Sequence, residues 1–169
     1  MNGKELGYYL EKYRNSVFAA ALFYLKNPHD ADDVLQDVFF RLYTYDGSFE
    51  SEEHVKAWLI RCAINRSKNL LHSPWYRLSA PLEAAVDKIQ SDNAGAGDDD
   101  VFRLLKKLGR RNRVALYLYY YEDYSTEEIA KMLGISTVAV TSRLKRGRKQ
   151  LGKLIEAERN AENGDKSTI

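Results

Sequence analysis

Apolar residues recur every three or four positions along most of the chain, and no segment alternates apolar and polar residues as a strand would. This periodicity predicts a first helix over residues 4–26. A second helix is expected after Asn27, which can cap it, with Pro28 in the first turn, where a missing amide costs nothing. A third helix is expected after Ser51, continuing to about residue 71. The pattern therefore predicts an all-α fold.

The segment over residues 124–151 has the pattern of a short helix, a tight turn and a second helix. Ser125 and Glu128 can form a capping box ahead of the first helix, and Gly134 can end it. Ser136 can cap the second helix. Its inward positions recur at helical spacing: Val140, Leu144, Gly147 and Leu151. This order is typical of a helix-turn-helix.

The outward face of that second helix carries hydroxyl groups early and cations later. The residues are Thr141, Ser142, Lys145, Arg146 and Lys149. On a recognition helix the N-terminal residues contact base edges, and later basic residues hold phosphates. A helical hairpin with a solvated basic face is the alternative. We favour DNA binding, because the glycine turn and the small Ala130 also suit two closely packed helices.

Composition divides the chain into two small helical domains joined by a flexible acidic linker. The linker, residues 73–100, is rich in proline, serine, alanine, glycine and acidic residues. The N-terminal domain is expected over residues 1–72, and the C-terminal domain, with four helices ending near residue 155, over 101–158. Residues 159–169 read as a tail that ends in a frayed segment.

Charge is distributed unevenly, although the net charge of the 169 residues is only +2. Residues 101–154 hold 13 basic and four acidic side chains, whereas residues 1–72 hold nine basic and ten acidic ones. Basic side chains that neutralise phosphates release counterions, so binding to DNA would weaken as salt rises. The charge pattern therefore supports a nucleic-acid partner for the C-terminal domain.

The helix after Asn27 has two contrasting faces. Six apolar positions at spacings of three and four form its inner face: Ala31, Val34, Leu35, Val38, Phe39 and Leu42. The opposite face forms an acidic stripe that ends in an aromatic residue: Asp33, Gln36, Asp37 and Phe40. A solvated helix face with one stray phenylalanine explains this pattern, and so does a surface for a protein partner.

The third helix also has two faces. Val55, Trp58, Leu59 and Cys62 are expected to be buried, and a polar, basic face carries Arg61, Asn65, Lys68 and His72. The preceding loop, residues 43–50, is rich in aromatic and hydroxyl groups, including Tyr45, Ser48 and Phe49. Such a loop beside cations can hold an unstacked base of single-stranded DNA. Composition alone favours an ordinary turn whose aromatic side chains pack inward.

Enzymatic function is not indicated. The three histidines, His29, His54 and His72, are scattered, and we identify no catalytic residues, no metal site and no cofactor-binding motif. The lone Cys62 permits no disulfide within the chain, reads as a structural residue, and fits a reducing cytoplasm. No segment resembles a signal peptide, and the longest apolar run, residues 114–121, is too short to span a bilayer. We expect a soluble, cytoplasmic, non-enzymatic protein.

Three segments carry a resemblance to a known family: DADDVLQDVFFRLY, VKAWLIRCAINRSKNLL and YSTEEIAKMLGISTVAVTSRLKRGRKQL. They resemble bacterial RNA polymerase sigma factors of the extracytoplasmic-function (ECF) group of the sigma-70 family. The likeness covers residues 8–72, which resemble sigma region 2, and residues 101–155, which resemble sigma region 4. It implies a factor that binds core RNA polymerase, recognises promoter DNA and helps to open it for transcription initiation.

The resemblance also implies roles for individual residues. Asp33, Gln36, Asp37 and Phe40 would bind the clamp helices of the largest polymerase subunit. Tyr45, Ser48 and Phe49, with Arg61, Asn65 and Lys68, would hold the melted minus-ten element. The minus-thirty-five element would be bound through Ser125, Thr126, Thr141, Ser142, Lys145, Arg146 and Lys149. The resemblance also implies an anti-sigma factor as a further partner and implies no direct membrane insertion.

The chain departs from the family pattern at a few positions. Leu108-Gly109-Arg110 stands where the family commonly has Leu-Pro, which removes a rigid helix start. Asn69 replaces a common acidic residue, and Gly147 replaces a frequent alanine at a cost of about 1 kcal/mol in helix stability. Five tyrosines lie close together in the sequence: Tyr117, Tyr119, Tyr120, Tyr121 and Tyr124. Of this tyrosine run, we expect Tyr117 and Tyr121 to lie in the core.

Two other functions remain open on the sequence alone. A conventional regulator would dimerise through its N-terminal helices and bind paired DNA half-sites tightly without polymerase. A degenerate relative would occupy polymerase or a regulator without opening promoters. Intact Trp58, Asn65 and recognition-helix cations favour the active sigma factor over the degenerate one.

Overall fold

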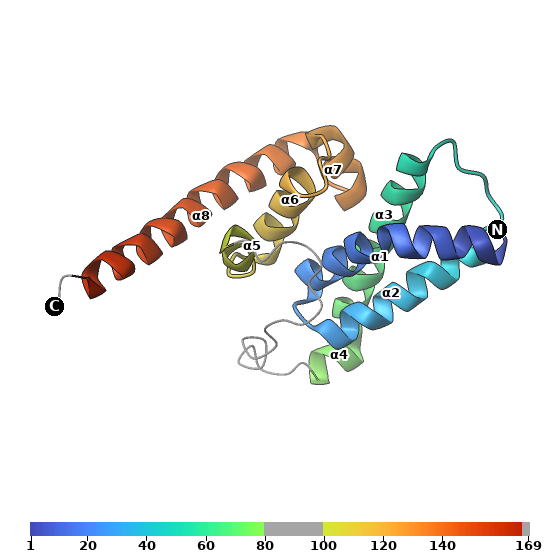
Figure 1. Ribbon diagram of the computed structural model, residues 1–169, viewed down its shortest axis with the longest axis horizontal. Coiled ribbons are helices and arrows are strands. Elements are labelled where there is room, and N and C mark those ends of the chain that lie inside the picture. The colour runs from blue at the N-terminus through green and yellow to red at the C-terminus, as the bar shows by residue number, and fades with distance from the viewer. Residues whose placement is uncertain (80–99, 167–169) are drawn as a thin grey trace. The chain divides into compact units, whose positions relative to one another are not determined.

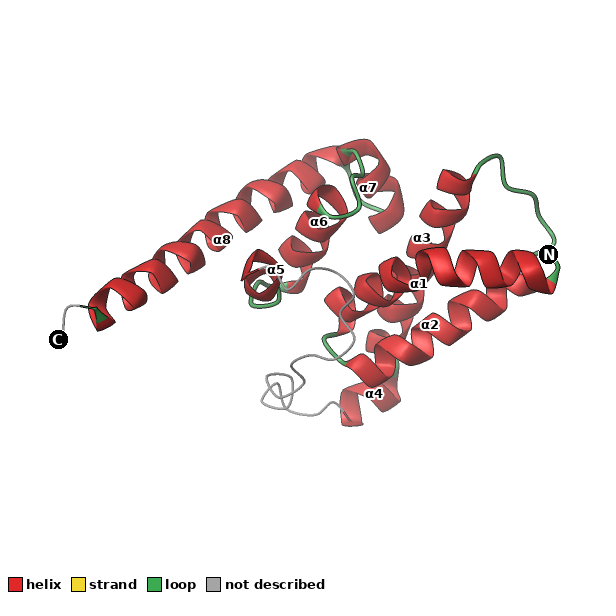
Figure 2. Ribbon diagram, viewed as in Figure 1, coloured by secondary structure: helices red, strands yellow, loops and turns green. Residues whose placement is uncertain are grey.

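The computed structural model describes residues 1–79 and 100–166, and every regular element in these ranges is a helix (Figures 1 and 2). The elements, in chain order, are α1 (Gly3–Leu25), α2 (Pro28–Tyr43), α3 (Glu52–His72), α4 (Pro74–Ser79), α5 (Asp100–Leu105), α6 (Arg110–Tyr120), α7 (Thr126–Leu133) and α8 (Thr137–Asp165). The all-α prediction is confirmed. None of these helices is long and apolar enough to cross a membrane.

The chain divides into two compact units, Met1–Ala96 and Gly97–Ile169. We call them the N-terminal and C-terminal units. Residues 80–99, which make up most of the predicted linker, lie outside the described residues, as do residues 167–169 of the predicted tail.

Helices α1, α2 and α3 pack against one another to form the N-terminal unit (Figure 1). Their starts follow the predicted caps, since Asn27 accepts hydrogen bonds from the first amides of α2 and Ser51 accepts one from His54 in α3. All six predicted inner residues of α2 are buried. The side chains of Lys12 and Tyr8 on α1 both bond to the Glu52 carboxylate, which links α1 to the first turn of α3.

Helix α4 was not predicted, because its residues fall in the segment interpreted as linker. It begins at Pro74, and the Ser73 side chain accepts a hydrogen bond from the Tyr76 amide at 3.2 Å. Serine followed by proline is a recognised start of a helix, so the signal was present in the sequence.

The C-terminal unit is formed by α5 to α8, with α6 crossing the long α8 and α7 packed beside its N-terminal end (Figure 1). The predicted helix-turn-helix is confirmed in detail. Ser125 and Glu128 form the capping box, Gly134 adopts the left-handed conformation with φ of 65°, and Ser136 caps α8. These local interactions set where the recognition helix begins.

Helix α8 continues to Asp165, well past the predicted end near residue 155. The Glu158 carboxylate, beyond that end, forms an ion pair with Arg103 at 2.8 Å and lies 3.9 Å from the Lys107 ammonium. Arg103 lies in α5 and Lys107 follows it, so these contacts attach the turns of α8 beyond residue 155 to the rest of the C-terminal unit.

The start of α6 lacks the proline that is common in the family pattern, and a hydrogen bond from Arg113 holds it instead. Gly109 is the N-cap with φ of −59°, close to the angle that proline imposes, and it provides no side-chain cap. The buried Arg113 guanidinium donates to the Leu108 carbonyl at 2.8 Å. Burial lowers the pKa of Arg113 to about 10, so the group stays charged at neutral pH.

The predicted core positions of the tyrosine run are confirmed for Tyr117, which is 2% exposed, and hold in part for Tyr121, which is half-buried and stacks against it. The Tyr117 hydroxyl donates to the buried Glu122 carboxylate. Burial raises the pKa of Tyr117 above its usual range, so the hydroxyl keeps the proton that it donates. This pair ties the end of α6 to the turn before α7.

Gly147 marks a close approach between α6 and α8. A Cβ atom at this position would lie 2.7 Å from Cδ1 and 3.0 Å from Cγ of Leu116, which is buried. The helix-propensity cost of this glycine is therefore offset by the close packing that it permits.

We predict opposite effects for the same substitution at two glycines of α8. Gly152→Ala should stabilise the C-terminal unit by about 0.5–1 kcal/mol, because no atom lies within 4 Å of the added methyl group. Gly147→Ala should show no gain and should destabilise the unit by up to about 2 kcal/mol, because Leu116 must move. Urea unfolding followed by circular dichroism measures both. Equal stabilisation by the two variants would contradict the close crossing.

Candidate nucleic-acid interfaces

The recognition helix α8 presents its predicted polar face to solvent. Val140, Leu144 and Gly147 are buried on the opposite side, and Leu151 is half-buried. Thr141 and the three predicted cations are exposed, whereas Ser142 is half-buried: the cations are Lys145, Arg146 and Lys149. The helix thus offers a continuous cationic surface of the kind that contacts DNA phosphates.

Hydrogen bonds within the first turns of α8 use several of its hydroxyl groups. The Ser136 oxygen accepts from the Ala139 amide at 3.1 Å, and the Thr141 hydroxyl donates to the Thr137 carbonyl at 3.0 Å. The Thr141 proton is therefore committed to the helix, which leaves its methyl group and its oxygen lone pairs for a ligand.

The start of α7 is less well suited to a phosphate than the sequence suggested. The Ser125 oxygen accepts the Glu128 amide, and the Thr126 hydroxyl donates to Glu127 at 3.2 Å. A hydrogen bond to the backbone of Glu127, followed by the bond from the Thr126 hydroxyl, lowers the pKa of the Glu127 carboxyl. Two carboxylates at this end oppose the attraction of a helix N-terminus for anions. The roles of Ser125 and Thr126 stay a prediction.

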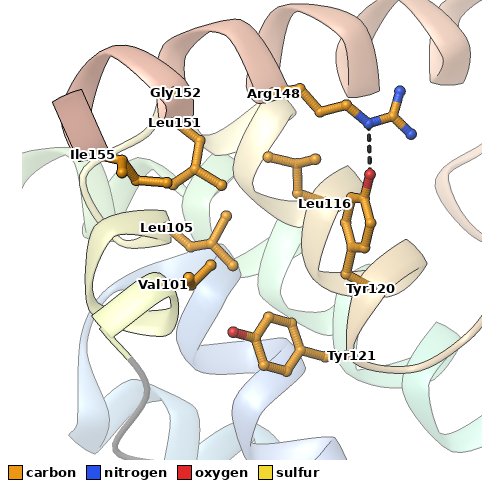
Figure 3. Close-up of a pocket in the computed structure, with 9 residues that line it drawn as sticks. All are labelled: Val101, Leu105, Leu116, Tyr120, Tyr121, Arg148, Leu151, Gly152 and Ile155. Carbon is orange, nitrogen blue, oxygen red and sulfur yellow. Dashed lines mark hydrogen bonds between the residues drawn. The ribbon is translucent and has the colours of Figure 1, made fainter.

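Sequence reasoning missed two features of α8. Val138, in the first turn, is 76% exposed. Arg148 lies against α6, where its Nε donates to the Tyr120 hydroxyl at 2.6 Å (Figure 3). Its guanidinium also stands over the rings of Tyr119 and Tyr120. Arg148 therefore fastens the recognition helix to its support, and only the three-dimensional crossing of α6 and α8 reveals this.

Beside Arg148, an apolar groove of about 460 Å³ opens between α5, α6 and α8 (Figure 3). The side chains drawn around it come from Val101, Leu105, Leu116, Tyr120, Tyr121, Arg148, Leu151 and Ile155, with Gly152 in its wall. Open apolar surface of this kind suits a protein partner rather than DNA.

The acidic stripe on α2 is less uniform than predicted. Asp33 and Gln36 are exposed, and the Phe40 side chain is 67% exposed. Asp37 is half-buried, and its carboxylate accepts from Nε of Arg66 on α3 at 2.6 Å. Part of the stripe therefore holds α2 to α3, and the remainder faces outward.

The predicted polar face of α3 is exposed at all four of its positions: Arg61, Asn65, Lys68 and His72. The opposite face differs from the prediction at two positions, because Trp58 and Cys62 are half-buried rather than buried. The Trp58 ring contacts the rings of Tyr45 and Phe49 in the loop before α3. Burial raises the pKa of the Cys62 thiol, which disfavours the nucleophilic thiolate and agrees with a structural role.

The loop before α3 forms an aromatic cluster on Trp58. The Tyr45 ring lies 5.0 Å from the Phe49 ring and 5.1 Å from the Trp58 ring, centroid to centroid. Phe49 also meets Trp58 edge to face at 5.7 Å. Tyr45 remains 37% exposed and Ser48 is exposed. The aromatic side chains thus pack together, and Tyr45 stays partly exposed. The binding of an unstacked base by this loop stays a prediction.

Gly47 makes room for the Tyr45 ring. A Cβ atom on Gly47 would lie far inside contact distance of the Tyr45 ring and hydroxyl. Because the backbone of Gly47 has no positive φ, the ring is the main obstacle to alanine at this position.

No group of three or more His, Cys, Asp or Glu side chains that could hold a metal ion occurs in residues 1–79 and 100–166.

Two family models match the chain. Sigma-70 region 2 matches residues 9–75, and Sigma-70, region 4 matches residues 98–151. Curated relatives include the ECF RNA polymerase sigma factor SigM of Mycobacterium tuberculosis, 32% identical over 77% of this chain and 66% of the relative. SigW of Bacillus subtilis is 26% identical over 83% of each chain, and the sigma-E factor of Escherichia coli is 28% identical over 75% of this chain and 74% of the relative. The chain thus spans about two thirds of the mycobacterial relative and more of the other two.

Solved structures have the same fold. The sigma factor RpoE in complex with the anti-sigma factor NepR from Bartonella quintana matches with a TM-score of 0.69 and 23% identity, over 90% of this chain and 98% of that one. CnrH in complex with the cytosolic domain of CnrY matches with a TM-score of 0.61 and 26% identity, over 92% and 90%.

We predict that Gly47→Ala displaces the Tyr45 ring from Trp58. In a Trp75→Phe background, which isolates the emission of Trp58, the substitution should change tryptophan fluorescence while helical circular dichroism is unchanged. Tyr45→Ala should produce its own change, and Gly47→Ala should then add nothing, because the obstructing ring is gone. Additive effects of the two substitutions would show that Gly47 acts on the loop in another way.

Proposed function

This chain belongs to the ECF group of the sigma-70 family of RNA polymerase sigma factors, and we propose that its two units recognise promoter DNA and polymerase through the surfaces described above. Sigma factors are non-enzymatic initiation factors that direct core RNA polymerase to specific promoters. The polymerase supplies the chemistry of RNA synthesis, and the residues of this chain bind and position.

We propose that the outward face of α2 binds the clamp helices of the largest polymerase subunit. Asp33, Gln36 and the 67% exposed Phe40 form this surface. An exposed aromatic side chain next to carboxylates suits a protein interface, where charge sets orientation and the ring provides buried area. Asp37 contributes through its ion pair with Arg66, which fixes α2 against α3.

The aromatic loop and the polar face of α3 would hold the melted minus-ten element. The exposed edge of Tyr45, with Ser48 and Phe49, offers stacking and hydrogen bonding to a base that has left the duplex. Arg61, Asn65 and Lys68 are exposed along the following helix and supply backbone and base contacts. Each stacked base contributes about 1–3 kcal/mol, enough to offset part of the cost of opening.

The recognition helix α8 would bind the minus-thirty-five element in the major groove. Thr141 and Ser142 stand in the half that meets base edges, and Lys145, Arg146 and Lys149 follow on the exposed cationic side. Ser125 and Thr126 at the start of α7 would complete the contact through the adjacent backbone.

An anti-sigma factor is proposed as a regulator of this chain. RpoE and CnrH, both similar in fold, were solved in complex with partner proteins, NepR and the cytosolic domain of CnrY. A regulator that covered Phe40 and Asp33 would prevent polymerase binding. We also propose a cytoplasmic location without membrane insertion, because core polymerase and the chromosome are there.

The observation that carries the proposal is that regions 2 and 4 both match in their usual order and that each unit exposes a surface suited to its assigned partner. The test is transcription in vitro with bacterial core polymerase, the purified chain and fragmented DNA of its own genome. Sequencing of transcript starts should reveal a shared upstream motif. Transcription at the level of core alone, combined with specific duplex binding by the free chain, would favour a conventional regulator instead.

We predict that Asp33→Lys weakens binding of the chain to core polymerase by about tenfold or more, because it reverses a charge on the proposed docking face. Glu11→Lys makes the same change of charge on an exposed position of α1 and should have little effect. Fluorescence anisotropy of the labelled chain measures both affinities. Asp37→Lys is avoided, since it would also break the ion pair with Arg66. Equal losses for Asp33→Lys and Glu11→Lys would place the docking face elsewhere.

A further inference from the structure

The first turn of the recognition helix presents an apolar side chain to solvent. Val138 is 76% exposed, whereas Val140 and Leu144 on the same helix are 0% and 2% exposed. A single exposed apolar residue is ordinary on a protein surface, so its exposure alone decides nothing. Its place in the helix carries the argument, because the N-terminal residues of a recognition helix are those that approach base edges.

Val138 lies on the same face as the predicted DNA contacts. Thr141, Ser142 and Lys145 follow it by three, four and seven residues, which are the spacings of one helix face. The face is therefore apolar at its start and cationic further along. Exposed cations favour a polyanion as the occupant, and the helix-turn-helix geometry favours the major groove of DNA over an acidic protein.

Two hydroxyl groups near Val138 already form hydrogen bonds within the helix. The Ser136 oxygen accepts the Ala139 amide, and the Thr141 hydroxyl donates its proton to the Thr137 carbonyl. What remains at this end includes the methyl groups of Val138 and Thr141. On the base edges of the major groove, the apolar group is the C5-methyl of thymine.

We propose that Val138 contacts a thymine methyl group in the upstream promoter element and so helps to determine which promoters are used. This inference rests on the proposed function of α8. It adds a specificity residue to the polar and cationic ones, and it assigns that residue a base. The contact is worth about a three- to fivefold preference for thymine, as expected for burial of a single methyl group.

The test uses core polymerase with the full chain and a promoter identified from its transcript starts. Each thymine of the upstream element is replaced in turn by deoxyuridine, which removes only the methyl group. Deoxyuridine outside the element serves as the control template. With the unsubstituted chain, one replacement should weaken promoter binding by about three- to fivefold. Val138→Ala should weaken binding to the thymine template by the same factor and should be insensitive to that replacement.

Val138→Ala should leave the fold intact, because the side chain is exposed and alanine favours the helix. The inference is overturned if no replacement affects the unsubstituted chain, or if the element contains no thymine, while promoter-directed initiation persists. It is also overturned if Val138→Ala weakens binding to core polymerase or to a protein regulator instead. Absence of any promoter-directed transcription would mark failure of the proposed function itself, which is a separate readout.

Discussion

Each helix of the two units can bury only part of its surface, and this constraint decides which residues are left for binding. Helix α2 shows it most clearly, since six apolar side chains are buried where it packs on α1 and α3, and Asp33, Gln36 and Phe40 are left exposed. The same holds for α8, where Val140, Leu144 and Gly147 are buried and the cations are exposed. The surfaces that we propose to bind polymerase and DNA are thus the outer faces of helices whose inner faces form the core of each unit.

Local sequence signals predicted the fold well. Caps at Asn27, Ser51, Ser125 and Ser136 start helices where they were expected, because a capping side chain acts on amides two or three residues away. Periodicity identified the buried faces for the same reason, since helical geometry maps spacing directly onto direction. The three sequence segments of the resemblance extended this from fold to function, and the family models support that extension.

Contacts between helices could not be predicted from one sequence. The ion pair of Asp37 with Arg66, the Tyr45 ring over Gly47, and the crossing of Gly147 on Leu116 join residues that are distant in the chain or depend on a particular loop shape. The first two change the interpretation of the site residues Asp37 and Tyr45, and the third explains a glycine within α8. The end of α8 was predicted too early for a related reason, because its additional turns carry Glu158, which pairs with Arg103 of α5.

The central claim is that this chain recognises promoters as part of a polymerase complex, and the most direct measurement compares its DNA binding with and without core enzyme. Affinity for a promoter duplex and for a scrambled duplex is measured by anisotropy at several salt concentrations. The account predicts weak, salt-sensitive binding with little preference by the chain alone, and strong preference for the promoter once core polymerase is added. Tight, selective binding by the chain alone, unchanged by core polymerase, would contradict it.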